Sequence, residues 1–584
     1  MLARTRRGSP ARRPTRSIGA VAALAVAALV GLAANQMTAT AHPAEAPPKN
    51  QRPAAAPTPP PATPAQPSPA PATSKPVPDP ATAGTAAGRA LAAQVTADGV
   101  LAHLRAFQKI ADANGGTRAS GVGNGYTRSV DYVERELRRA GYRVTRQAFS
   151  FPYFEEVHPT TFRRTAPTTR TYRGPEEFRI LSYSGNGVVA ARVHPVDVNL
   201  TPPRASTSGC EAADFVGFPA GAVALLQRGT CDFSVKVRNA VDARAAGAII
   251  FNQGNGSPTA NKDRYETFGG TLQKPSSIPA IAVSYEIGAD LAASPSVRVR
   301  IETDARSETR TTANLLAQLP GPATGRTVMV GAHLDSVPEG PGINDNGSGS
   351  AGVLEVAVRW AELVRNAESP PPNPVRFAWW GAEESGLLGA KHYVDHLTPA
   401  QKRAIALYLN FDMIGSPNYE LGVYDGDNSD GREGTTRGPS GSAQIERFFR
   451  NFLAERGQKS APSGFDGRSD YGPFIAKGVG IPAGGIDTGA EGIKSRSAAE
   501  KFGGVPGVAY DPCYHQACDG LTPSFPDRAK KEAYRKLAAA YGSRLVGNVN
   551  VVPLDLISDA IAAAVGRYAY DVSDVEGASA SPSP

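Results

Sequence analysis

Three apolar segments in the second half of this 584-residue chain constrain its fold more than any other feature. They are TVMVGAHLD (327–335), VRFAWWGAEE (375–384) and IALYLNFDMIG (405–415). Each has the length of a buried strand and ends in polar residues, and helical patterns follow at Gly349–Arg365 and Ala443–Gly457. The repeated order of strand, loop and helix predicts an α/β fold with a mixed, mostly parallel central sheet flanked by helices.

Polar residues follow these strands at the place where ligands usually bind. In open α/β sheets, ligands bind at the carboxyl ends of the strands. Two more candidates lie in loops, Asp345 in the glycine-rich GINDNGSGS and His515 in DPCYHQACDG. The residues that end or directly follow the three segments are His333, Asp335, Glu383, Glu384 and Asp412.

These residue types point to metal chemistry. Histidine nitrogen and carboxylate oxygen are the ligands that zinc takes where no thiolate is offered. Glu383 is then left as a general base that takes a proton from metal-bound water and passes it to the leaving amine. Asp335 is expected to accept a hydrogen bond from the second ring nitrogen of His333. The predicted ligands of a two-metal site are His333, Asp345, Glu384, Asp412 and His515.

Taken singly, each of these residues also fits a structural role. A carboxylate can cap a turn or begin a helix, and a lone histidine at a strand end is more often structural than a ligand. Only the set as a whole, with its members at strand ends and loops, favours the metal site over these alternatives.

The four cysteines lie in two regions of the chain, Cys210 and Cys231 in one and Cys513 and Cys518 in the other. An even number of cysteines fits an oxidising compartment, and local pairing is the simplest of three connectivities. Free buried thiols and zinc thiolates are the alternatives, although the C-x4-C spacing of the second pair has no matching pair nearby for a zinc knuckle.

Tyr514 and His515 lie between the cysteines of the second pair. A disulfide there would close a tight loop and hold both side chains in place. The Tyr514 hydroxyl could then donate a hydrogen bond to a developing oxyanion, while a tyrosine packed in the core is the alternative interpretation.

The N-terminus is typical of an exported protein. Residues 1–41 carry six arginines, no acid, an apolar run at 18–34 and the small-residue site Ala39-Thr40-Ala41. These features predict a signal peptide and a secreted, extracellular protein without stable membrane association after cleavage, with a membrane anchor as the alternative. Arg12-Arg13 leaves both the twin-arginine and the general secretory route open.

Charge argues against two classes of partner. The net charge of +8 depends largely on the six N-terminal arginines, without which 56 basic and 54 acidic residues remain. Such a balance predicts neither a nucleic-acid nor an anionic-membrane partner.

Several motif blocks resemble those of a known family. GAHLDSVPEGPGINDNGSG, RFAWWGAEESGLLGAKHYV, YLNFDMIGSPN, DGRSDYGPF and DPCYHQACD are similar to blocks of the secreted bacterial two-zinc aminopeptidases, which are co-catalytic zinc exopeptidases of the leucine aminopeptidase type. GCEAADFVG, VALLQRGTCDFSVKVRNA and AGAIIFNQG resemble a protease-associated domain. The resemblance spans roughly residues 90 to 520 and implies the zinc exopeptidase fold with a β-rich insert.

Composition and resemblance together predict the domain organisation. The segment 42–87 is rich in proline and alanine and is expected to be a disordered linker. A zinc peptidase domain is expected over 88–156 and 313–572, and its first helices over 96–116 and 129–140. The protease-associated insert, with a helix at 233–246, is expected over 157–312, and a disordered tail over 573–584.

The resemblance also implies a role for each site residue. His333, Asp345 and Asp412 would hold one of two Zn²⁺ ions, and Asp345 would bridge to a second ion held by Glu384 and His515. Glu383 would be the general base and later acid, and Tyr514 would steady the oxyanion. Arg468 would lie near the amino terminus of the substrate, and Asp470 would support that loop.

The expected function is that of a secreted zinc aminopeptidase. It would remove the N-terminal residue of peptides or proteins through a metal-bridging water activated by Glu383, with the family's preference for large apolar residues, and act as a monomer. Single-zinc glutaminyl cyclases, ligand-poor receptor-like relatives and carboxypeptidases on the same core are the alternatives. No acid cluster matches the secondary calcium site of some relatives, so calcium is unsupported, and the resemblance assigns no role to 520–555.

Overall fold

The computed structural model describes residues 79–577, except 260, 294–295, 322–325, 368–369, 432–433 and 526. The expected signal peptide (1–41) and the first part of the expected linker lie outside the described residues. Among the helices of the described residues, none has the length and apolar character needed to cross a membrane.

The predicted α/β fold is confirmed. Parallel strands form the middle of the larger sheet, where β9 pairs with β10 and β11, and β11 pairs with β14. The antiparallel strands β8 and β12 adjoin this parallel group and make the sheet mixed. The order is β13 (Ala461–Ser463), β12 (Gly422–Tyr424), β14 (Ala483–Asp487), β11 (Ile405–Asn410), β9 (Thr327–His333), β10 (Val375–Trp380) and β8 (Arg298–Gln318).

Helices cover both faces of this sheet. Successive residues of a strand point to opposite faces, so neighbouring residues of one strand belong to different apolar clusters. Val328 and Val330 of β9 belong to one apolar cluster, and Met329 belongs to another. The first cluster includes residues of α2 (Ala97–Asp112), α3 (Gly125–Ala140), α6 (Gly349–Arg365), α9 (Ser442–Glu455) and α13 (Val551–Tyr570). The second includes residues of α7 (Leu388–Asp395) and α10 (Tyr471–Ile475), and the short α8 (Pro399–Ala404) precedes β11.

The inserted part is built on a second run of strands in the order β4, β5, β6, β7 and β3. Val223 and Ala224 of β5 enter two different apolar clusters, so both faces of this sheet are covered. The strands are β3 (Phe178–Ile180), β4 (Gly187–Pro195), β5 (Val223–Gln227), β6 (Gly247–Phe251) and β7 (Ala280–Val283), with the helices α4 (Phe233–Asp242) and α5 (Tyr285–Ala292).

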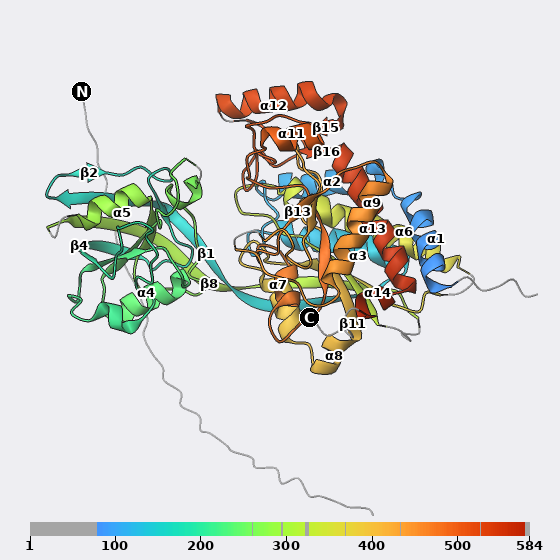
Figure 1. Cartoon of the computed structure of the whole chain (residues 1–584), viewed down its shortest axis with the longest axis horizontal. Coiled ribbons are helices and arrows are strands. Elements are labelled where there is room, and N and C mark those ends of the chain that lie inside the picture. The colour runs from blue at the N-terminus through green and yellow to red at the C-terminus, as the bar shows by residue number, and fades with distance from the viewer. Residues whose placement is uncertain are drawn as a thin grey trace, which may run out of the picture. The chain divides into compact units, whose positions relative to one another are not determined.

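Two long strands link the expected domains along the chain. β1 (Arg143–Ala166) pairs antiparallel with β8 along most of its length (Figure 1) and also with β2 (Arg170–Thr171). Both long strands run through the expected insert boundaries at 156/157 and 312/313, so no strand end marks those boundaries.

The linker prediction is wrong at its C-terminal end. Helix α1 (Pro80–Ala92) begins inside the expected linker, where the Asp79 side chain accepts the N–H of Thr82. Cβ atoms at Gly84 and Gly88 would lie 2.7 Å from carbonyl oxygens of α13. The small residues that suggested disorder therefore permit close packing of the two helices.

The expectation of disorder is also wrong at the start of 573–584, and residues 578–584 lie outside the described residues. Helix α14 (Ser573–Gly577) occupies the start of 573–584, and Val575 is buried. One apolar residue in a polar segment is a weak signal in sequence, and here it is enough to anchor one helical turn.

The segment 520–555, to which the resemblance assigned nothing, folds next to the C-terminal ends of the sheet strands. It contains α12 (Arg528–Tyr541), the hairpin β15 (Leu545–Val546) and β16 (Val549–Asn550), and the start of α13. Helix α11 (Arg496–Phe502) precedes it, and Cys513 packs with Tyr534 and Leu537 of α12.

Candidate metal centre

The strand order brings the predicted ligands to one edge of the sheet. His333 is the last residue of β9 and pairs in register with Trp380 of β10. Glu383 and Glu384 follow β10, and Asp412 follows β11, which is parallel to β9. Because parallel strands end at the same edge, residues far apart in the sequence meet there.

Asp345 lies between the two histidines of the site. Its Oδ1 is 3.3 Å from His333 Nε2, and its Oδ2 is 3.2 Å from His515 Nε2. Asp412 Oδ1 is 3.3 Å from the same His333 nitrogen, and Glu384 Oε2 is 3.1 Å from His515 Nε2. All five predicted ligands are thus brought together in two groups that share Asp345, and ligand atoms within each group lie within 4.8 Å of one another.

The site carries more negative charge than its own cations balance. Oxygens of Glu384 (Oε1) and Asp412 (Oδ1) are buried without a hydrogen-bond partner. Burial and the charge of Asp345 raise the pKa of Glu384 to about 7. Burial by itself would lower the pKa of His515, but Glu384 and Asp345 raise it to about 11. Buried carboxylate oxygens that lack hydrogen-bond partners, beside histidine nitrogens, are what a cation site requires.

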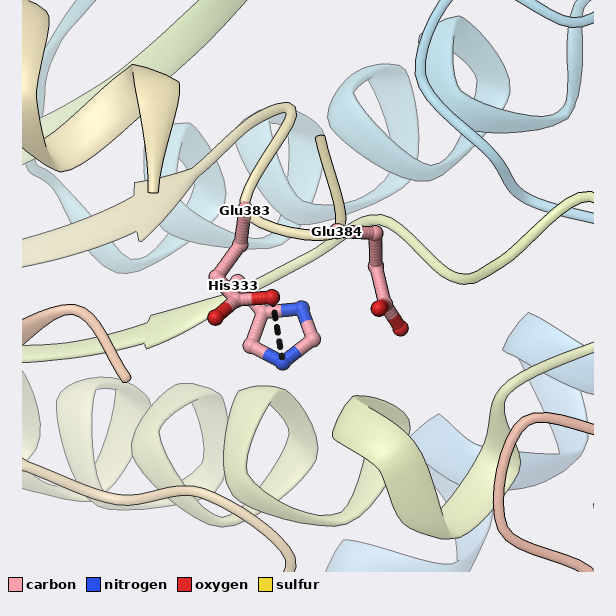
Figure 2. Close-up of side chains that lie close together, drawn as sticks. All are labelled: His333, Glu383 and Glu384. Carbon is pink, nitrogen blue, oxygen red and sulfur yellow. Dashed lines mark ion pairs between the residues drawn. The ribbon is translucent and has the colours of Figure 1, made fainter. Parts of the chain in front are cut away.

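The Glu383 carboxylate lies next to the His333 ring, as Figure 2 shows. Its Oε2 lies 3.8 Å from His333 Nε2, and Glu384 leaves the same loop beside it (Figure 2). Burial raises the pKa of Glu383 well above its ordinary value; His333 opposes this shift and Glu384 adds to it. A third group of atoms within 4.8 Å joins His333, Glu383 and Glu384, so Glu383 lies beside both groups of predicted ligands.

The Asp335 carboxylate lies close to His333, as expected, but beyond hydrogen-bond distance. His333 Nδ1 lies 3.1 Å from the backbone oxygen of Asp335 and 3.7 Å from its Oδ1. The carboxylate instead accepts the N–H of Glu383 at 3.2 Å. The backbone oxygen of Asp335 thus orients the His333 ring so that Nε2 faces the other predicted ligands. The Asp335 side chain holds the loop that carries Glu383.

The second cysteine pair shapes the remaining side of the site. Cys513 and Cys518 are joined, as are Cys210 and Cys231 in the insert, which is the local pairing predicted. Within the small loop the ring of Tyr514 stacks on that of His515 at 3.8 Å between centroids.

Arg468 is held beside Tyr514. Its Nη2 lies 3.3 Å from the Tyr514 hydroxyl oxygen and 3.0 Å from Glu491 Oε1. Asp470, two residues on, is buried, and both of its carboxylate oxygens lack a hydrogen-bond partner. Burial raises the pKa of Asp470 well above its ordinary value, with His333 opposing and Asp412 adding to the shift.

The sequence analysis did not identify the residues that hydrogen-bond to the predicted ligands. Ser469 Oγ donates to Asp412 Oδ2 at 2.6 Å. Asp519 accepts the N–H of Asp345 at 3.0 Å and that of Asn344 at 2.8 Å. Asp519 directly follows the second cysteine pair, and this position was the only available signal of its role.

The segment 520–555 supplies the next layer of contacts. Asn548 Nδ2 donates to Asp519 at 2.8 Å and to Asp511 at 3.0 Å, and Tyr534 of α12 donates to its Oδ1. All three hydrogen-bonded side chains around Asn548 are buried. The segment therefore supplies, through the Asn548 amide that Tyr534 holds, hydrogen bonds to Asp511 and Asp519, and Asp519 in turn holds the backbone of Asp345.

We expect Asn548→Ala to lower the free energy of unfolding by about 2–4 kcal/mol, because hydrogen bonds to two buried carboxylates are lost. Chemical denaturation measures the change. Asn366→Ala, which removes an exposed amide that bonds only within α6, is the matched control and should change stability by less than about 0.5 kcal/mol. Equal effects of both variants would contradict a supporting role for Asn548.

Another acid group lies away from this edge. Asp425, Asp427 and Glu446 approach one another closely enough to hold an ion. Asp425, however, accepts the N–H groups of Ser429 and Asp430, each at 2.9 Å, and Glu446 accepts that of Gly426 at 3.0 Å. These bonds account for the buried oxygens without a cation.

A cavity of about 410 Å³ opens over the ligands. Leu387, Met413 and Tyr424 contribute apolar surface to its wall. Its described lining also includes Asp466, Arg468 and Asp487 beside the ligands and Tyr514. The cavity is large enough for an amino-acid side chain and the peptide bond that follows it.

Known proteins share both the sequence and the fold. Peptidase family M28 matches residues 314–540, and the PA domain matches 194–291. An aminopeptidase of Pseudomonas aeruginosa is 46% identical over 425 residues, which cover 73% of this chain and 76% of that protein. Leucine aminopeptidase 2 of Trichophyton tonsurans is 38% identical over 422 residues, covering 71% and 78%.

Two further comparisons agree. A probable lipoprotein aminopeptidase of Mycobacterium tuberculosis is 40% identical over 438 residues, covering 74% of this chain and 82% of that protein. The solved aminopeptidase of Aneurinibacillus sp. strain AM-1 superposes with a TM-score of 0.59 at 23% identity, covering 82% of this chain and 95% of that one.

The chain has the zinc exopeptidase fold, with candidate metal ligands clustered at its binding edge, and its relatives define a metallo-hydrolase. The chain belongs to peptidase family M28 and carries an inserted PA domain. The enzyme class expected from the sequence, a metallo-aminopeptidase, is confirmed.

Proposed function

We propose that this chain is a secreted aminopeptidase that uses two Zn²⁺ ions to remove the N-terminal residue of peptides or proteins. The observation that carries the proposal is the position of Asp345, whose two oxygens face two different histidines at 3.3 and 3.2 Å. A carboxylate so placed suits a bridge between two ions. The first ion would be held by His333 and Asp412, and the second by Glu384 and His515.

The donor set fits zinc. It offers imidazole nitrogen and carboxylate oxygen, and two of its oxygens are buried without a partner. When bound, zinc acts as a Lewis acid that polarises the scissile carbonyl and lowers the pKa of water. We place both ions at the five ligands and neither at the group around Asp425.

Glu383 would act as general base and then as general acid. Its carboxylate lies beside the ligands, and its raised pKa suits a group that accepts a proton from water and returns it to the leaving amine. Tyr514 would donate its hydroxyl to the oxyanion. Arg468, held at 3.3 Å from that hydroxyl oxygen, would keep the tyrosine in place.

A free substrate amine would bind among the acids of the site, beside Glu383 and Asp412. A carboxypeptidase would instead need a cation that is free to bind the C-terminal carboxylate of its substrate. Among the described residues that line the cavity, Arg468 is the only lysine or arginine, and it is paired with Glu491. This charge pattern favours an aminopeptidase over a carboxypeptidase.

The apolar wall of Leu387, Met413 and Tyr424 supports a preference for large first residues. We further propose that residues 1–41 direct export and are removed, and that the mature enzyme is a monomer. Gel filtration and N-terminal sequencing of the exported protein test both points.

Blocking the substrate amine is expected to reduce hydrolysis strongly. Leu-p-nitroanilide should be cleaved, and N-acetyl-Leu-p-nitroanilide should be cleaved at least about 100-fold more slowly, because a charged anchor worth about 3 kcal/mol is lost. Chelation should abolish cleavage, and added zinc should restore it at two ions per chain by elemental analysis.

Three results would contradict the proposal. Equal cleavage of the free and blocked substrates would exclude an aminopeptidase. A single zinc with cyclisation of an N-terminal glutamine peptide would indicate a glutaminyl cyclase. Cleavage of a peptide only when its C-terminus is free would indicate a carboxypeptidase.

A further inference from the structure

Asp487 lies beside the proposed ligand Asp412, on the neighbouring strand. β11 and β14 are parallel, with Tyr408 opposite Ala483 and Asn410 opposite Gly485. The same register continued by two residues places position 412 opposite Asp487. Neighbouring strands are about 4.8 Å apart, so the two carboxylates lie at adjacent places on the binding edge.

The Asp487 carboxyl group lacks a cationic partner. Its Oδ1 accepts the N–H of Gly489 at 3.1 Å, and its Oδ2 is buried without a hydrogen-bond partner. Burial raises the pKa of Asp487 to about 7; hydrogen bonds from Ser463 and Gly489 oppose this shift, and the charges of Glu420 and Asp412 add to it. A positive charge nearby would have the opposite effect and would stabilise the carboxylate.

The residues that line the cavity with Asp487 suit a long side chain that ends in a cation. Leu387, Met413 and Tyr424 line it with apolar surface, which suits a methylene stem. Gly464, Gly489 and Ala490 also line the cavity and occupy little space. Arg468, the only lysine or arginine in the described lining, is paired with Glu491.

We propose that the enzyme prefers substrates whose first residue is lysine or arginine, and that Asp487 determines this specificity. The proposal rests on the proposed aminopeptidase function, because it places the substrate amine near Asp412. An extended lysine spans roughly 6 Å from Cα to its ammonium nitrogen, enough to pass from one strand end to the next. An uncharged first residue leaves Asp487 Oδ2 buried and unpaired, which disfavours its binding.

The proposal is tested by comparing kcat/KM for the p-nitroanilides of lysine, arginine, norleucine and leucine. Norleucine has the four-carbon stem of lysine without the ammonium group, so the ratio of the two isolates the charge. We expect the wild-type enzyme to favour lysine over norleucine by roughly 10- to 100-fold. In Asp487→Asn this ratio should fall to about one or below, with the value for norleucine unchanged or raised.

Two further variants separate specificity from damage to the site. Asp487→Leu should raise kcat/KM for norleucine and leucine and lower it for lysine, because the acid is replaced by apolar surface. Asp395→Asn removes an exposed negative charge that pairs with Lys391, and it should leave the ratio as in the wild type. Zinc content and the melting temperature show that each variant is folded and loaded.

The outcomes distinguish this proposal from the one on which it rests. A wild-type enzyme that cleaves norleucine or leucine as well as lysine overturns the specificity proposal and leaves the aminopeptidase function standing. An equal loss for all four substrates in Asp487→Asn likewise overturns it, since a specificity residue must act on the ratio. Failure to cleave any substrate with a free amine overturns the proposed function itself.

Discussion

Replacing Glu383 with glutamine should lower kcat roughly 10²- to 10⁴-fold while leaving two zinc ions per chain. This loss is the contribution that general acid–base catalysis typically makes to the rate. Glutamine keeps the size of the side chain but cannot accept that proton. The KM for Leu-p-nitroanilide should change little. Steady-state kinetics and elemental analysis of the same preparation measure both quantities.

Glu339→Gln is the matched control for Glu383→Gln. Glu339 lies in the loop between His333 and Asp345, is exposed, and is absent from the lining of the cavity. Its variant should keep wild-type kcat. If Glu383→Gln loses zinc as well as activity, Glu383 is a ligand, as its proximity to His333 and Glu384 would allow. If it keeps both, another group is the base.

Asp345→Asn should remove both ions and with them the activity. Only one side-chain oxygen remains in asparagine, and it is neutral, so the two groups of ligands no longer share a carboxylate. Loss of the Lewis acid costs several kcal/mol of transition-state stabilisation, or at least about 10³-fold in rate. Elemental analysis should give less than one zinc per chain.

A stability measurement provides a second readout for Asp345→Asn. Ions that bind only the folded protein raise its melting temperature, so zinc should stabilise the wild type and have little effect on the variant. Asp427→Asn, which alters an exposed acid outside the proposed zinc site, should retain both ions and the zinc-dependent rise. Two zinc ions in Asp345→Asn would contradict the bridging role.

The clustering of the candidate ligand residues could be predicted because these residues lie next to strong local signals. His333 and Asp412 adjoin strands that read as apolar runs, and parallel strands ending at one edge bring such residues together. The closest Asp335 oxygen to His333 is the carbonyl oxygen and not the predicted carboxylate, because the choice between these two acceptors depends on the turn after β9, which spacing does not specify.

Helix α1 shows why composition gave the wrong C-terminal limit for the expected linker. Gly84 and Gly88 resemble linker residues in isolation. Their role comes from contact with backbone atoms of Arg567 and Ala563, which are 483 and 475 residues away in the sequence. Asn548 is a similar case. Its amide matters only because the fold places it between two acids that no local pattern connects to it.

The sequence by itself determined the α/β class and supplied the candidate residues that offer nitrogen and oxygen to metal, because strand periodicity and the residues that adjoin each strand are local features. It favoured the local disulfide pairs, which the structure then confirmed. Only the tertiary structure decided which oxygen of Asp345 faces which histidine, how the segment 520–555 supports the site, and that Asp487 stands beside Asp412. Those relations depend on strand register and on side-chain packing between distant parts of the chain, and both are set by the free energy of the whole fold rather than by any one segment.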